Sequence, residues 1–357
     1  MEAFTGTRPL AQPLDTVALE AWLAAHVSGF AGPLAIEQFK GGQSNPTYLL
    51  KTPGAQYVMR SKPGPVAKLL PSAHAIEREF TVMRALAGSA VPVPTMLALC
   101  EDEGVIGRAF YVMSFMAGRV LWDQSLPGMS NADRAAHYEE LGRVIAALHQ
   151  VDVQAVGLSD YGKPGNYFER QIGRWSKQYL ASVTEPNPAM DALLAWLPAH
   201  IPASARDERE VSIVHGDYRM DNVVFHPTEP RIIAVLDWEL STLGHPLADF
   251  SYHCMSWHIQ TSGAARGLGG KNLDELGIPS ERAYVQRYCE RTGRSDVNAV
   301  MADWNFYLAY NLFRIAAIVQ GIAKRVVDGT ASSAQARETA ASARPLAELA
   351  WQFAQKA

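Results

Sequence analysis

The sequence predicts an α+β protein with two lobes: a small N-terminal lobe built on a five-stranded antiparallel sheet and a larger, mostly helical C-terminal lobe. The first third of the chain alternates short apolar runs with turn residues, which is typical of an antiparallel meander. Most of the remainder carries apolar residues at helical spacing. Its 357 residues suffice for two separate cores. We place the lobes at residues 1–115 and 116–357, with the join near Ser114–Gly118.

Turn residues separate the predicted elements of the N-terminal lobe. A helix near Val17–Val27 precedes the first strand, and a tight turn rich in glycine precedes the second. After the third strand, a helix ends near Gly88 and the Pro-containing stretch that follows it. The predicted strands are Leu34–Lys40, Thr47–Lys51, Gln56–Ser61, Thr95–Glu101 and Ala109–Phe115, and the helix between the third and the fourth is Ala73–Ala87.

The C-terminal lobe is predicted to be mostly helical, for example over Ala132–Gln150 and Asp303–Arg325. One strand–loop–strand segment, Val211–Glu239, interrupts the helices. The apolar run Ile315–Ile322 is much shorter than the roughly 18–20 residues that span a bilayer. We therefore expect it to lie in a buried core helix, and we expect no membrane association.

Composition excludes several classes of function. The formal net charge is −4 and no run of basic residues occurs, so we expect no binding to nucleic acid. The three cysteines, Cys100, Cys254 and Cys289, are an odd number without metal-ligand spacing. A disulfide framework is therefore not expected, and a reducing cytoplasm is the simpler prediction. The N-terminus also lacks the basic-then-apolar layout of a secretion signal.

The chemistry is expected in the segment Val211–Glu239. Its first apolar strand ends in the polar loop His215-Gly216-Asp217-Tyr218-Arg219-Met220-Asp221-Asn222, and a second strand leaves that loop. The third, Ile232–Leu236, ends in Asp237. Phosphoryl transfer needs one carboxylate to accept the proton of the attacking hydroxyl, and oxygen donors to hold magnesium against the phosphates. Asp217 and Asn222, five positions apart, match the spacing of a kinase catalytic loop.

These residues resemble a known family. The loop from His215 to Asn222, followed by Leu236-Asp237-Trp238-Glu239, resembles the aminoglycoside phosphotransferase and choline kinase group, which has a protein-kinase-like fold. More narrowly, Val235–Ser241 and Leu243–Asp249 resemble the kinase-like domain found fused to, or near, acyl-CoA dehydrogenases. The resemblance runs from about Phe39 to Gln320, which is most of the chain.

The resemblance implies a small-molecule kinase that uses ATP and Mg2+. It makes Asp217 the catalytic base, with His215 and Arg219 in the same catalytic loop, and makes Asn222 and Asp237 the magnesium ligands. Residues 1–115 would bind the nucleotide, and residues 116–357 would carry catalysis and the acceptor site. The narrower resemblance implies a hydroxyacyl-CoA as acceptor and a functional link to an acyl-CoA dehydrogenase. Aminoglycosides, choline-like amines and sugars stay open.

The N-terminal lobe offers three further sets of candidate nucleotide-binding residues. The turn Gly41-Gly42-Gln43-Ser44-Asn45 would cover the phosphates with backbone N–H groups, although an ordinary hairpin turn explains it as well. Arg60 lies where this kind of kinase usually has a lysine, and Lys62 follows on the same strand face. Glu79 lies on the apolar face of the next helix, where a buried carboxylate needs a partner such as Arg60. By resemblance, backbone groups of Ser114 and Met116 would bind adenine.

Two other functions stay open at this point. An arginine in place of the lysine favours a nucleotide-binding pseudokinase, although all three residues assigned to catalysis are present. Histidines and carboxylates in one region of the sequence are also compatible with a metal-dependent hydrolase, but no tight ligand spacing occurs. The members of that region are His215, His226, His245, His253 and His258, with Asp217, Asp237 and Asp249. Asp249 is expected to support the catalytic loop or cap a helix, and Arg314 to contribute to an acceptor pocket or a structural ion pair.

Overall fold

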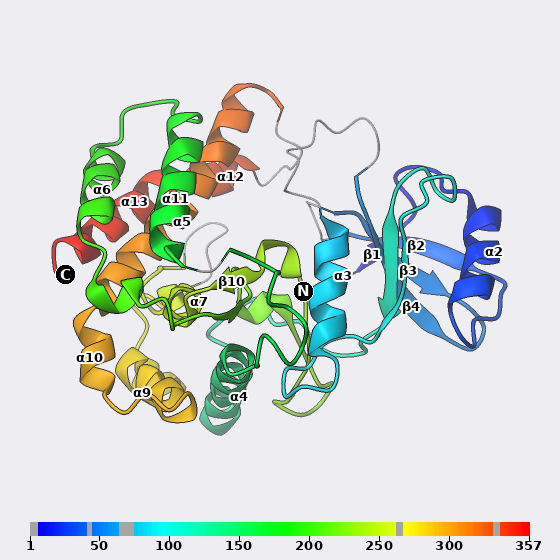
Figure 1. The fold of residues 1–357 in the computed structure, drawn as a ribbon, viewed down its shortest axis with the longest axis horizontal. Coiled ribbons are helices and arrows are strands. Elements are labelled where there is room, and N and C mark those ends of the chain that lie inside the picture. The colour runs from blue at the N-terminus through cyan, green and yellow to red at the C-terminus, as the bar shows by residue number, and fades with distance from the viewer. Residues whose placement is uncertain (1–5, 41–44, 64–74, 164, 262–266, 331–335) are drawn as a thin grey trace. The chain divides into compact units, whose positions relative to one another are not determined.

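The computed structural model describes residues 6–40, 45–63, 75–163, 165–261, 267–330 and 336–357 (Figure 1). The chain forms two compact units. The first comprises Met1–Val120, Val156–Leu158 and Asp221–Ser241, and the second comprises Leu121–Ala155, Ser159–Met220 and Thr242–Ala357. This grouping adds to the first unit a segment, Asp221–Ser241, that the sequence placed in the second lobe. The boundary at residue 115 stays a prediction.

An antiparallel sheet of six strands, in the order β1-β2-β3-β4-β6-β5, forms the centre of the first unit. The prediction of five strands was therefore one short. The additional strand, β1, has two residues and pairs with β2, and so brief a segment has no periodicity to detect. The strands are β1 (Thr7–Arg8), β2 (Ala35–Phe39), β3 (Thr47–Lys51), β4 (Gln56–Ser61), β5 (Met96–Cys100) and β6 (Phe110–Ser114).

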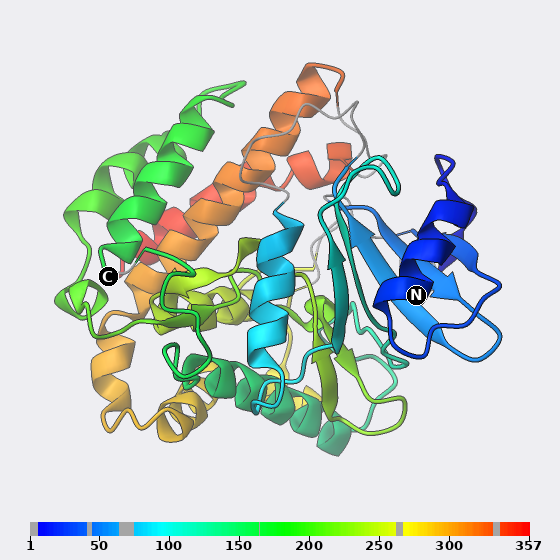
Figure 2. The same cartoon turned by 45° about the vertical axis from the view of Figure 1, so that its right-hand side comes forward.

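Helices α2 (Thr16–His26) and α3 (Ile76–Leu86) lie on opposite faces of this sheet (Figures 1 and 2). Successive side chains of a strand point to opposite faces, so β6 serves both helices. Phe110 and Val112 join the core that contains Leu19 and Leu23 of α2. Tyr111, between them, faces α3 and donates to Glu79. The same alternation on β4 sends Arg60 to the α3 side.

A β-hairpin completes the first unit. Strands β8 (Val223–Phe225) and β9 (Ile232–Val235) pair antiparallel, and Arg119 exchanges two backbone hydrogen bonds with Phe225, both 2.8 Å long. Gly118 permits this approach, because a Cβ atom there would lie 2.3 Å from the Phe225 carbonyl oxygen. The hairpin is thus attached to the chain segment that follows β6.

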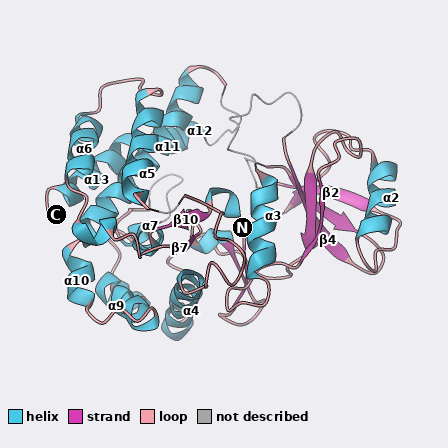
Figure 3. Ribbon diagram, in the orientation of Figure 1, coloured by secondary structure: helices cyan, strands magenta, loops and turns pink. Residues whose placement is uncertain are grey.

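The second unit is mostly helical, with one pair of short strands, β7 (Ser212–Val214) and β10 (Thr242–Gly244), among its described residues (Figure 3). Its 24-residue helix α11 (Trp304–Val327) is long and apolar enough to cross a membrane by length and composition, but 72% of its most apolar window is buried. It packs against α5, α7 and α13, as expected for a core helix. The other helices are α4 (Asn131–His149), α5 (Tyr167–Leu180), α6 (Pro188–Ala199), α7 (Pro246–Cys254), α8 (Leu273–Leu276), α9 (Glu281–Arg291), α10 (Val297–Ala302), α12 (Ala336–Ala340) and α13 (Ala343–Ala354).

Candidate active site

Three carboxylates surround the guanidinium of Arg60 in the first unit. Arg60 Nη2 donates to Asp237 Oδ1 at 2.8 Å and to Glu239 Oε2 at 3.3 Å, while Nε lies 3.3 Å from Glu79 Oε2. Burial alone would lower the pKa of Arg60, but the charges of the three carboxylates outweigh it and the pKa is raised. The predicted pairing of Arg60 with Glu79 is confirmed. Asp237 and Glu239 contact the same Arg60 guanidinium.

Glu79 is almost completely buried, with 1% of its surface exposed. Its Oε1 accepts from Asn45 Nδ2 at 3.1 Å, and its Oε2 accepts from the Tyr111 hydroxyl at 3.1 Å. Burial raises the pKa of Glu79, and the charge of Arg60 partly offsets that effect. Asn45, predicted in a phosphate-covering turn, thus has a buried side chain that supports Glu79. The remainder of that turn, Gly41, Gly42, Gln43 and Ser44, lies outside the described residues.

Lys62 has a different environment. It follows the last residue of β4 and pairs with Glu77, which like Glu79 lies in the first turn of α3. The Lys62 and Glu77 side chains are 32% and 29% exposed, against 11% for Arg60. Both cations therefore face α3, as their spacing predicts, but Arg60 is the one that contacts Asp237.

At the predicted adenine-binding segment, one of the two backbone polar groups of Ser114 is already used within the sheet. The backbone N–H of Ser114 donates to the Thr95 carbonyl at 2.9 Å, because Ser114 still belongs to the sheet at the end of β6. That N–H is therefore not available to a base, and only the carbonyl of Ser114 stays a candidate. Its hydroxyl accepts from the Thr95 N–H at 3.0 Å and approaches the sulfur of Met116 at 3.5 Å.

The β8–β9 hairpin brings Asn222 and Asp237 to the same end. Asn222 immediately precedes β8, Asp237 follows β9 by two residues, and Leu236 N donates to Asn222 O at 2.8 Å. Asp237 adopts a left-handed backbone conformation, with φ 65° and ψ 58°. Residues other than glycine are uncommon in this region, although Asp and Asn adopt it more readily than most, and such conformations are concentrated at functional sites. Asp237 keeps 34% of its side chain exposed.

The second unit contains His215, Asp217 and Arg219. Asp217 Oδ1 accepts from the Tyr252 hydroxyl and lies 3.2 Å from Arg219 Nε, and the backbone N–H of Asp217 donates to His215 Nδ1 at 3.2 Å. The Asp217 side chain is 19% exposed, so it is accessible yet held on two sides. His215 is completely buried and supports the loop through its ring.

Asp249, on α7, fixes the backbone before Asp217. Its two carboxylate oxygens accept from the N–H groups of His215 at 2.7 Å and Gly216 at 2.8 Å, and His149 Nε2 lies 3.2 Å away. Burial would raise the pKa of Asp249, but His149 and the His215 contacts lower it below its ordinary value. The expectation that Asp249 supports the catalytic loop is confirmed. Among the described residues no group of three or more His, Cys, Asp or Glu forms a metal-holding cluster.

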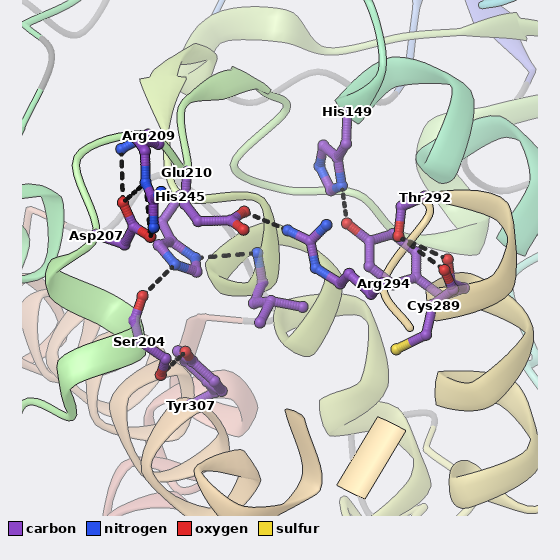
Figure 4. Close-up of polar contacts among 12 residues, drawn as sticks. His149, Ser204, Asp207, Arg209, Glu210, His245, Cys289, Thr292, Arg294 and Tyr307 are labelled. Atoms are coloured by element: carbon purple, nitrogen blue, oxygen red, sulfur yellow. Dashed lines mark hydrogen bonds and ion pairs between the residues drawn. The ribbon is translucent and has the colours of Figure 1, made fainter. Parts of the chain in front are cut away.

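A polar network stabilises the same unit around His245 (Figure 4). His245 Nδ1 accepts from Leu247 N at 3.2 Å, and Nε2 donates to Ser204 O at 3.3 Å. Burial lowers the pKa of His245 to about 4, so the ring is neutral at physiological pH. Arg294 pairs with Glu210 in the same view, and His149 points toward the Tyr288 hydroxyl at 2.7 Å. His245 and His149 therefore stabilise the second unit through hydrogen bonds.

Sequence reasoning missed two residues that contact the candidate site. Glu239 follows Asp237 by two positions, and its place directly after the conspicuous Asp237-Trp238 pair was the available signal. Tyr252 lies three residues after Asp249 on α7. The local sequence of this helix does not indicate that the Tyr252 hydroxyl contacts the Asp217 carboxylate.

A family model described as the phosphotransferase enzyme family matches residues 35–284. The chain belongs to this family. The phosphotransferase is 45% identical over 356 residues to mouse acyl-CoA dehydrogenase family member 10, covering 98% of the chain and 32% of that protein. It is 42% identical to a probable acyl-CoA dehydrogenase, IBR3, of Arabidopsis thaliana, covering 95% of the chain and 43% of that protein. It thus spans less than half the length of these curated relatives.

Solved structures agree with the family assignment. The phosphotransferase is 63% identical to a protein from Ralstonia eutropha JMP134 whose name places it provisionally among the aminoglycoside phosphotransferases; the TM-score is 0.87, over 96% of this chain and 99% of that one. A thermostable mutant of aminoglycoside phosphotransferase APH(4)-Ia, in complex with ADP and hygromycin B, has a TM-score of 0.61 at 17% identity, over 94% and 97%. This second likeness shows the protein-kinase-like fold. The chain is accordingly a member of a phosphotransferase enzyme family, with a protein-kinase-like fold.

Proposed function

We propose that this phosphotransferase transfers the γ-phosphoryl group of ATP to a hydroxyl group of a small metabolite. The observation that carries the proposal is the contact of Arg60 with both Glu79 and Asp237. In kinases of this fold, a strand cation paired with a helix glutamate contacts the phosphates, and a nearby aspartate binds the metal ion. Arg60 makes the ion pair with the helix glutamate that the usual lysine makes, which supports an active kinase over the pseudokinase alternative.

Asp217 would accept the proton of the acceptor hydroxyl as that oxygen attacks the γ-phosphorus. The bond between the γ-phosphorus and the bridging oxygen breaks, leaving ADP and a phosphate monoester. Tyr252 and Arg219 hold the Asp217 carboxylate in a fixed orientation, which supports proton acceptance by a positioned base. Asp249 keeps the loop in place through two backbone N–H groups.

The donor set at the end of the β8–β9 hairpin fits magnesium. Asn222 and Asp237 offer amide and carboxylate oxygens, and Mg2+ is usually bound by one or two carboxylates together with substrate phosphates. Bound there, the ion would neutralise charge on the phosphate oxygens. Arg60 would add a cationic contact to the phosphates. We assign residues 1–115 to nucleotide binding and residues 116–357 to catalysis and acceptor binding, with Asn222 and Asp237 supplied by the later segment.

A hydroxyacyl-CoA is the acceptor that we favour. The support is the likeness, over nearly the whole chain, to segments of proteins named acyl-CoA dehydrogenases. A kinase that acts beside such an enzyme would modify the hydroxyl of an acyl thioester. The same likeness favours a functional link between this phosphotransferase and an acyl-CoA dehydrogenase.

The proposal is tested by mass spectrometry of reactions that contain the protein, Mg-ATP and one acceptor each from a panel. The panel holds hydroxyacyl-CoAs, choline, aminoglycosides and sugars, and the Asp217→Asn protein is the control. We expect one acceptor to gain a single phosphoryl group with the wild type only. ATP binding without transfer to any acceptor would favour the pseudokinase, and failure to bind ATP would refute the proposal.

A further inference from the structure

Arg314 is a buried cation beside the catalytic loop, and no ion pair to it occurs among the described residues. It lies on α11, is 5% exposed, and its Nη2 donates to the carbonyl oxygen of Gly216 at 2.5 Å. That carbonyl belongs to the peptide unit directly before Asp217. Because this hydrogen bond goes to a neutral carbonyl and not to a carboxylate, the guanidinium can still bind an oxygen acceptor of a ligand.

Aromatic rings enclose this guanidinium. Arg314 Cζ lies 5.0 Å from the centroid of the Tyr252 ring and 5.4 Å from that of Trp175. Tyr252 is the residue whose hydroxyl donates to Asp217, so the aromatic site lies one side chain from the candidate base. Aromatic rings around a positive charge are the usual recognition site for cationic ligands. In this protein the guanidinium of Arg314 occupies the position that a cationic ligand would take.

Two buried donors at this site have no hydrogen-bond partner among the described residues: Arg314 Nε and Trp175 Nε1. Trp175 is 4% exposed, so neither donor is left to bulk solvent. An unsatisfied buried donor is costly, and an incoming oxygen acceptor removes that cost. A second arginine lies at the same aromatic side chain, since Arg174 Cζ is 5.1 Å from the centroid of the Trp175 ring.

We propose that Arg314 determines which acceptors the phosphotransferase uses: its guanidinium fills the aromatic site, excludes cationic acceptors, and binds a carbonyl or carboxylate oxygen of the acceptor. The inference rests on the proposed function, and it deepens it by naming a feature of the acceptor besides its hydroxyl. A thioester carbonyl and a free carboxylate share this chemistry. Choline-like amines and aminoglycosides carry the opposite charge and are disfavoured.

The test compares four acceptors of matched chain length: a hydroxyacyl-CoA, the free hydroxy acid, the corresponding diol, and an amino alcohol. In the wild type, kcat/KM should be highest for one of the two carbonyl-bearing acceptors, and which one identifies thioester or carboxylate. In Arg314→Met, that value should fall roughly tenfold to hundredfold, mainly through KM, while the value for the diol stays nearly unchanged. Arg314→Lys should keep the discrimination against the amino alcohol. Arg325→Met, on the same helix at an exposed position, is the matched control.

Several outcomes would overturn the inference. An equal fall in kcat for all four acceptors in Arg314→Met would show that Arg314 only positions the Gly216 backbone. A preference of the wild type for the diol or the amino alcohol would refute carbonyl recognition, even if the variants did not fold. If no acceptor is phosphorylated, the proposed function fails, but calorimetric titration of the hydroxyacyl-CoA and the hydroxy acid, with a non-hydrolysable ATP analogue present, still decides the inference. Binding to the wild type that is lost in Arg314→Met supports it, and any other result contradicts it.

Discussion

Arg60 and Asp237, separated by 177 positions in the sequence, are joined by a 2.8 Å hydrogen bond from Nη2 to Oδ1. The carboxylate assigned to magnesium is therefore in direct contact with the cation assigned to the phosphates. The same Nη2 reaches Glu239, and the same guanidinium is paired with Glu79. Changes at any of these four residues are expected to alter both stability and nucleotide binding.

Replacing Arg60 with methionine should destabilise the protein strongly. It leaves Glu79 buried beside two other carboxylates without a cation, and breaking a buried pair typically costs about 3–5 kcal/mol. It should also raise KM for ATP. Chemical unfolding and steady-state kinetics measure the two effects.

Lys62→Met is the matched control for Arg60→Met. Lys62 and Glu77 form a partly exposed pair, and such pairs contribute about 0–1 kcal/mol. We expect near-normal stability and near-normal KM for ATP. If KM for ATP rises more in Lys62→Met than in Arg60→Met, Lys62 and not Arg60 contacts the phosphates.

Tyr252→Phe should lower kcat without changing KM for ATP. It removes the hydroxyl that donates to Asp217 Oδ1, and a hydrogen bond to a charged group is worth enough to change the rate roughly tenfold. The comparison variant is Tyr218→Phe, which removes another buried hydroxyl, one that donates to the Leu141 carbonyl at 3.0 Å. Tyr218→Phe should reduce stability yet retain kcat. Equal kcat values for the two variants would argue against a role for Tyr252 in positioning Asp217.

Asp237→Asn and Asp237→Ala should differ in stability but agree in function. The left-handed backbone at this position is tolerated by Asn, whereas for alanine it costs about 1–2 kcal/mol. Both variants lose the carboxylate, so both should weaken nucleotide binding in the presence of Mg2+ more than in its absence. Calorimetric titration of ATP with and without Mg2+ measures this. If the Mg2+ dependence of ATP binding is the same in both variants as in the wild type, Asp237 is not a magnesium ligand.

The stability of the fold should decrease on acidification from about pH 6.5 to pH 4. Burial lowers the pKa of both His245 and His253 from 6.5 to about 4, so within this window the unfolded chain binds more protons than the folded one. Their contribution is fully present above pH 6.5 and is lost toward pH 4, on the order of 3 kcal/mol for each histidine.

Unfolding by urea at pH 7, 6 and 5 measures this dependence. His253→Gln removes one titrating group and should flatten the loss of stability with falling pH, whereas His200→Gln at an exposed position should leave it unchanged. Parallel curves for all three proteins would show that the buried histidines do not carry the acid sensitivity.

Sequence reasoning located most elements because their signals are local. The strands Thr47–Lys51 and Gln56–Ser61 were predicted with the bounds that the structure has, since a Pro-Gly turn separates two alternating apolar runs. The partnership of Arg60 with Glu79 followed from a carboxylate on an apolar helix face, which requires a cation. The two-residue β1 and the three-residue β10 were missed, because so few residues show no periodicity.

Contacts between distant segments could not be predicted in the same way. Nothing in the order of residues states that Glu239 would share the guanidinium of Arg60, or that the Tyr252 hydroxyl would point at Asp217 rather than into the core. The binding of adenine by backbone groups of Ser114 and Met116 stays a prediction, but the sequence did not indicate that the Ser114 N–H would donate to the Thr95 carbonyl at the end of β6. These outcomes depend on tertiary packing, which a local pattern does not encode.

The membership of Asp221–Ser241 in the first unit has a consequence for biosynthesis. Domains generally form as the nascent chain emerges, N-terminal segments first. Here the first 120 residues leave the ribosome without the hairpin that supplies Asp237 and Glu239, so Arg60 and Glu79 lack half of their cluster. Completion of this unit must wait until residue 241 has been translated, by which time a long stretch of the second unit has already emerged. The first unit therefore cannot complete its folding before much of the second unit has been synthesised.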